Sequence, residues 1–139
     1  MAGEFSNKGA EYALDIVTGR AAGPGVRTTY LALLAWPTGA PGDATDLSTM
    51  QEINTAGYSR QSVAWTAPSG DPRSTSNSAT ITFGPFTADP PNVTHCALVS
   101  AASGTTGDLL MFWTLNSARD AQSGDSIQVN SGALTMTLD

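Results

Sequence analysis

The chain has 139 residues and a formal net charge of −6, and charged residues make up only 13% of it. This length predicts a single domain over 1–139 that buries enough surface to fold without metal ions or disulfides. One lysine and five arginines provide no basic stripe for a phosphate backbone, so we expect no nucleic-acid partner. The apolar runs are too short to span a membrane, so we expect no membrane span. The N-terminal segment is acidic where an export signal would be basic, so we expect no export signal.

The segment 6–19 has the pattern of an amphipathic helix. Ser6 is a candidate N-cap, and Gly19 is a candidate residue for a left-handed C-terminal cap. At 100° per residue, one face carries Ala10, Ala13, Leu14 and Val17, and Tyr12 and Ile16 widen it. The opposite side carries Lys8, Glu11 and Asp15. We therefore expect the apolar face to lie against the body of the domain or against a neighbouring subunit.

From residue 27 onward the pattern changes to short β-favouring runs separated by Gly, Pro, Asn, Asp and Ser clusters. Seven such runs occupy residues 27–36, 58–65, 78–83, 93–101, 108–115, 126–130 and 133–139. The fourth and fifth runs are apolar on both faces, which is typical of interior strands. The sequence therefore predicts a mainly β fold, an antiparallel β-sandwich or small barrel over 27–139 that follows the N-terminal helix.

Two connections carry recognisable turn signals. Residues 101–108 have the composition of a hairpin loop between two strands. Within 47–53, Ser48 followed by Gln51 matches a capping box, so this stretch forms either a short helical turn or an irregular loop.

Nucleophilic catalysis would depend on His95, because it is the single histidine of the chain. Its neighbour Cys96 is the single cysteine, and a thiolate beside an imidazole is an activated nucleophile. Adjacent residues of a strand point to opposite faces, however, so we expect the two side chains to diverge. The G-x-S-x-G motif of serine hydrolases is missing from the sequence.

The aspartates are spaced singly in expected loops, where such residues commonly stabilise turns. Asp43 with Asp46, or Asp120 with Asp125, could bind calcium, but neither pair matches a calcium-binding loop motif. We predict no catalytic, cofactor-binding or metal-binding residues, no cofactor and no enzymatic activity.

Aromatic residues mostly fall in or beside the expected strands, which favours core packing. A sugar-binding platform would need two or three of them exposed together. Trp36 and Phe86 are the best candidates for exposure, because each adjoins a proline-rich loop.

The order of five motifs resembles a family of small virion proteins of tailed bacteriophages, described as fibre-like or head-decoration proteins. The motifs are TTYLALLAWPTGAP, AGYSRQSVAW, SNSATITF, NVTHCALVSAASGTTGDLLMFWTL and SGDSIQVNSGALTMTLD, which together cover about 28–139. The opening helix also fits that family, which has no catalytic signature. The chain departs from the pattern in the long connection PTGAPGDATDLSTMQEI and in the segment FGPFTADPP.

The resemblance implies a virion structural protein made in the host cytoplasm. The first expectation is a cement protein that binds and stabilises the outside of the major capsid protein shell, as a trimer at three-fold positions. The alternative is a tail-fibre or tail-tip protein that binds a host receptor or glycan. A third possibility, a lectin-like or hydrolytic domain unrelated to virions, would depend on His95 or on the Asp43/Asp46 loop.

Overall fold

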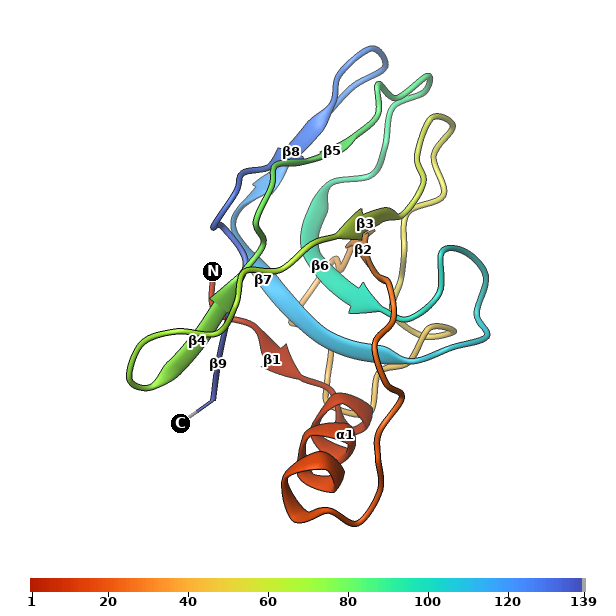
Figure 1. Cartoon of the computed structure of the whole chain (residues 1–139). Coiled ribbons are helices and arrows are strands. Elements are labelled where there is room, and N and C mark those ends of the chain that lie inside the picture. Colours follow the sequence, from red (N-terminus) through yellow and green to blue (C-terminus); the bar gives the residue numbers. More distant parts are fainter. Residues whose placement is uncertain (139) are drawn as a thin grey trace.

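The computed structural model describes residues 1–138, and Figure 1 shows a mainly β protein with one helix at its N-terminal end. The elements in chain order are β1 (Glu4–Phe5), α1 (Asn7–Thr18), β2 (Thr29–Leu34), β3 (Gln61–Val63), β4 (Arg73–Ser76), β5 (Ile81–Phe83), β6 (Val93–Val99), β7 (Leu109–Arg119), β8 (Ile127–Val129) and β9 (Thr135–Leu138). Each of the seven expected runs contains a strand, although residue 139 of the last run lies outside the described residues. None of the helical structure in 1–138 is long and apolar enough to cross a bilayer.

The strands form one large antiparallel sheet and two small ones. The large sheet has the order β1-β7-β6-β2-β3, and the two-stranded sheets are β4-β9 and β5-β8. Within residues 1–138 the strands do not close into a barrel. The expected β-sandwich with an N-terminal helix is therefore confirmed.

Two short strands were not expected. β1 contributes two residues, which pair with Met111 and Phe112 of β7. β4 has the sequence RSTS and lacks apolar side chains, so period-two hydrophobicity could not reveal it. It forms because each of its four residues pairs with a residue of the antiparallel strand β9.

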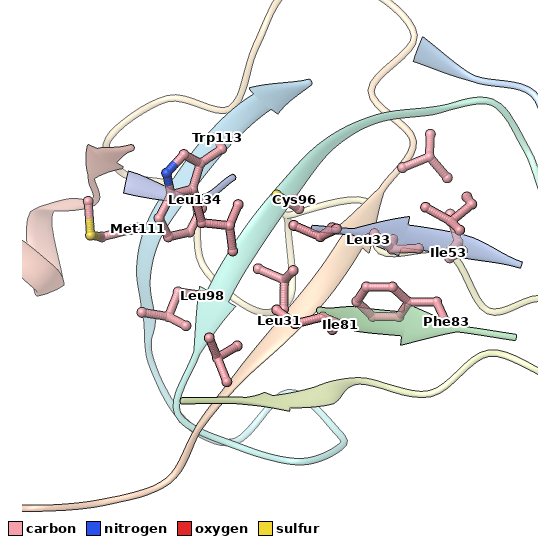
Figure 2. Close-up of a cluster of buried hydrophobic side chains, with 14 of the residues drawn as sticks. Leu31, Leu33, Ile53, Ile81, Phe83, Cys96, Leu98, Met111, Trp113 and Leu134 are labelled. Atoms are coloured by element: carbon pink, nitrogen blue, oxygen red, sulfur yellow. The ribbon is translucent and has the colours of Figure 1, made fainter. Parts of the chain in front are cut away.

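The main core lies between the large sheet and the two small ones. Figure 2 shows Leu31 and Leu33 of β2 near Ile81 and Phe83 of β5 in this core, whereas Trp113 of β7 lies beside Leu134. Trp113 is fully buried, donates its indole N–H to the Thr135 carbonyl oxygen at 3.1 Å, and thereby ties β7 to β9. Burial on this scale supplies most of the stability of a domain of this size.

The opposite face of the large sheet is buried as well. Ala32, Leu34, Ala97 and Val99 pack there against Leu47 and Met50, which come from the connection after β2. This second layer explains why β2 and β6 are apolar on both faces, as the sequence predicted.

The connection over 47–53 is a loop, so the capping-box interpretation is wrong. Asp46, and not Ser48, organises the turn, because its carboxylate accepts hydrogen bonds from the Ser48 and Thr49 amides at 2.9 and 3.1 Å. Gln51 then adopts a positive φ of 54°, which ends any helical course. The hairpin loop expected over 101–108 is present and is closed by a hydrogen bond from the Ser100 amide to the Asp108 carbonyl oxygen.

Candidate functional site: an apolar assembly surface

Helix α1 is anchored to the large sheet at the start of β7. Ser6 caps the helix by accepting a hydrogen bond from the Gly9 amide at 3.1 Å, and its hydroxyl donates to the carbonyl oxygen of Leu109. A Cβ atom at Gly9 would collide with the Leu110 carbonyl oxygen, so glycine permits this close approach. Gly19 ends the helix in the left-handed conformation, with φ of 69°. Both predicted caps are confirmed.

A polar cluster fixes the rotation of α1 about its own axis. Tyr12 donates a hydrogen bond to the Asp108 carboxylate at 2.7 Å, and this bond together with burial raises the pKa of the phenol. The Arg27 guanidinium lies 5.3 Å from the centre of the Tyr12 ring and 4.0 Å from the same carboxylate. The side of α1 that carries Tyr12 therefore faces the domain.

The domain itself covers the expected apolar face of the helix only in part, and coverage of the rest by a neighbouring subunit stays a prediction. Leu14 and Val17, which were expected to be covered, are 64% and 79% exposed. Asp15, which was expected to face water, is only 8% exposed and bonds to the Arg20 guanidinium at 2.6 Å. The contacts of the polar cluster join residues far apart in sequence. They determine which side of the helix is buried in the domain, and helical periodicity alone does not show this.

The exposed apolar side chains of this region form what we call the α1 surface. It comprises Leu14, Ile16 and Val17 of the helix and Val26 of the following loop, all more than half exposed. An apolar groove of about 210 Å³ adjoins it. Phe5, Tyr12 and Ile16 line the groove on the helix side, and Leu110 and Met136 line it on the sheet side. Clustered exposed apolar side chains of this kind mark contact sites for other molecules.

The residues weighed for catalysis do not form a catalytic pair. Cys96 faces the main core beside Leu33, and His95 lies on the other face of β6, opposite Leu34. The divergence predicted from strand geometry is confirmed. His95 Nδ1 lies 2.8 Å from the Thr94 hydroxyl, and within residues 1–138 the buried Nε2 has no hydrogen-bond partner. Burial lowers the pKa of His95, because it penalises the charged imidazolium.

One aspartate of each pair considered for calcium, Asp46 and Asp125, takes part in a turn. Asp46 organises the turn described above, and Asp125 accepts a hydrogen bond from the Gln122 amide at 3.0 Å. Hydrogen bonds from Ser48 lower the pKa of Asp46. In the described part of the chain, no three His, Cys, Asp or Glu side chains gather as they would around a metal ion.

The aromatic residues do not form an exposed platform. Phe86 is fully buried in the main core, so its expected exposure is wrong. The cause is that its amide donates to the Asp125 carbonyl oxygen at 2.9 Å, which turns the proline-rich segment inward. Trp36 is half-buried, and its amide donates to the Thr94 hydroxyl at 2.9 Å.

In a comparison with known protein families, residues 4–137 match a family described as podophage GP4 fiber I protein gp80. The chain belongs to this Gp80 family. It is therefore a virion structural protein of a bacteriophage, which confirms the resemblance seen in the sequence. A search of curated proteins found no match. The Gp80 match includes α1 and every strand from β2 to β8.

Proposed function

We propose that the chain is a non-enzymatic subunit of a phage fibre and that it assembles with further copies of itself through the α1 surface. The observation that carries this proposal is the exposure of Leu14, Ile16 and Val17 on a helix that is firmly capped and anchored. The description of the Gp80 family as a fibre protein supports the choice of a fibre over other parts of the virion.

Apolar side chains that stay in water on the α1 surface carry a free-energy cost. Burying a leucine or valine side chain is worth about 1.5–3 kcal/mol, so a contact that covers several of them is favourable. Such a contact would leave no unpaired charge at Lys8 or Arg20, because these residues are already paired with Glu11 and Asp15. Interface cores are depleted in charged residues in the same way.

A closed symmetric assembly would cover the α1 surface of every copy at once. We propose a trimer, in which the groove of each copy receives apolar side chains of the next. Repeated contacts along a fibre would then give durable attachment from individually modest interfaces.

Labelling of whole phage particles tests the fibre role. Gold-labelled antibodies raised against the purified chain should mark the fibres and leave the capsid shell unmarked. If the chain instead decorated the shell by binding the major capsid protein, the label would be spread over the head. Label confined to the head would overturn the fibre assignment in favour of decoration.

A further inference from the structure

A second surface feature lies at the other end of β7 from α1, where this strand leaves the regular sheet. The pairs Val93–Arg119 and His95–Thr114 enclose one residue on β6 but four residues, 115–118, on β7. This irregularity is larger than an ordinary β-bulge, and a bulge bends the strand that carries it. A pocket of about 240 Å³ lies between the bulge, strand β8 and the loop that follows β8. Bulges of this type commonly occur beside functional sites.

The rim of the pocket is polar. It carries Asn116, Ser117 and Arg119 from β7, Gln128 from β8 and Asn130 from the following loop, and all five are exposed. Only the Gln128 side chain forms a hydrogen bond within residues 1–138, to the Thr82 hydroxyl at 3.4 Å. The remaining amide, hydroxyl and guanidinium groups are therefore available to a ligand.

The floor of the pocket is apolar. Leu33 lies at its base, and Ile127 and Val129 line it from β8. An apolar floor beneath a rim of convergent hydrogen-bonding groups is the usual arrangement of a small-molecule site. The volume is below the roughly 300–1,000 Å³ of sites for drug-sized ligands, so the pocket fits one small unit, such as a monosaccharide.

The charges of the residues that line the pocket indicate which kind of small ligand it can bind. No acidic side chain among residues 1–138 lines the pocket, and within the same residues Arg119 forms no ion pair. Met1 also lines it, and its ammonium group donates to the Ala133 carbonyl oxygen at 2.7 Å. No aromatic ring lines it either, so a neutral sugar would find no stacking platform there. Arg119 can bind a carboxylate through paired charge-assisted hydrogen bonds, which are about twice as strong as neutral ones.

We propose that this pocket binds a carboxylate-bearing sugar unit. Arg119 holds the carboxylate, the amides of Asn116 and Asn130 bind ring hydroxyls, and the apolar face of the ring lies on Ile127 and Val129. An adjoining hollow shares Arg119, Ile127 and Gln128 and carries Asp120 and Asp125, whose carboxylates accept hydroxyl hydrogens from a second, neutral unit. This site is separate from the α1 surface and does not depend on assembly.

Saturation-transfer NMR on the full chain tests the proposal, because it works on monomers and assemblies alike. The probes are galacturonic, glucuronic and N-acetylneuraminic acids, with galactose and glucose as neutral counterparts of the first two. We expect at least one acid to bind and its neutral counterpart to bind at least about tenfold more weakly. The Arg119→Gln variant should lose the same factor, whereas Arg73→Gln, which changes an exposed arginine of β4, should bind like the wild type.

Four results would overturn the proposal. The first is no binding of any acidic sugar, and the second is equal binding of an acid and its neutral counterpart. The third is unchanged binding by Arg119→Gln. The fourth is binding of acetate as tight as that of the sugar acid, which would reveal a simple anion site. Unchanged sedimentation of Arg119→Gln separates loss of this site from failure of the proposed assembly.

Discussion

Arg60 and Glu52 form a two-pronged ion pair beneath the hairpin loop that joins β6 to β7. The Arg60 Nε lies 2.8 Å from Glu52 Oε1, and Nη2 lies 2.7 Å from Oε2. The same guanidinium donates to the carbonyl oxygens of Ala101 and Gly104 at 2.9 and 2.8 Å. The pair therefore ties the segment before β3 to the hairpin loop.

Removal of one member of this pair should destabilise the fold. The Arg60 side chain is 4% exposed and that of Glu52 is 21% exposed, so each charge depends on the other. We expect Arg60→Met to lower the free energy of unfolding by about 3 kcal/mol, because it leaves the Glu52 carboxylate without its counter-charge, with only the Tyr58 hydroxyl as donor, and two carbonyl oxygens without their partner. Urea titration followed by tryptophan fluorescence measures this loss. The double variant Arg60→Met/Glu52→Gln should lose less than the sum of the single losses, and strict additivity would show that the two residues act independently.

A charge placed on the α1 surface should break the assembly without unfolding the protein. Val17 is 79% exposed, so Val17→Asp should leave the melting temperature of the isolated subunit within a few degrees of the wild type. Sedimentation velocity of the full chain should show the wild type as an oligomer and Val17→Asp as a monomer, because the interface would have to bury an unpaired carboxylate.

The matched control for this experiment is Asn92→Asp, which adds the same charge with almost no change of shape. Asn92 is exposed and directly precedes β6, at the end of that strand opposite to the one near α1. The control should sediment like the wild type. If Asn92→Asp also dissociates the assembly, net charge and not the α1 surface governs association.

Acid should weaken the fold through His95. Its pKa is lowered in the folded state by burial, below the ordinary value of 6.5, and the nearby Glu4 charge opposes this only in part. Between these two values the unfolded chain binds more protons, so stability is complete above about pH 6.5 and declines as the pH falls through the folded-state pKa. Melting temperatures at about pH 7.5 and 5.5 should therefore differ less in His95→Gln than in the wild type. An identical pH dependence in the two proteins would contradict this prediction.

Cys96 should be inert while the protein is folded. Burial raises the pKa of its thiol to about 12, so the reactive thiolate is almost absent near neutral pH. Ellman's reagent should not react with the native protein at about pH 8 over the time in which it reacts fully in denaturant. Rapid reaction of the native protein would show that the core around Cys96 opens readily.

The fold was predictable where one local rule determined the outcome. β6 and β7 follow from continuous apolar runs, and the caps at Ser6 and Gly19 follow from residue type and position. Helical periodicity placed Tyr12 on the apolar face of α1, but it could not predict that this edge of the face meets the domain, since that depends on the contact between Tyr12 and Asp108, which are 96 residues apart. Helical periodicity describes which residues share a face and says nothing of which distant group that face meets.

The candidate sites were less predictable than the fold. Phe86 was expected on the surface because proline-rich segments are usually exposed, but the hydrogen bond to Asp125 draws it into the core. The pocket beside Arg119 arises from a register shift between β6 and β7, which depends on strand pairing. The sole sequence signal for it is the change from apolar to polar residues after Leu115.

Cryo-electron tomography of intact particles, with averaging over the fibres, tests the central claim most directly. We expect several copies of the β-sandwich to fit the fibre density. We also expect Leu14, Ile16 and Val17 of each copy to contact a neighbouring copy. Fibre density in which α1 faces solvent in every copy, or subunits found on the capsid shell alone, would contradict this claim.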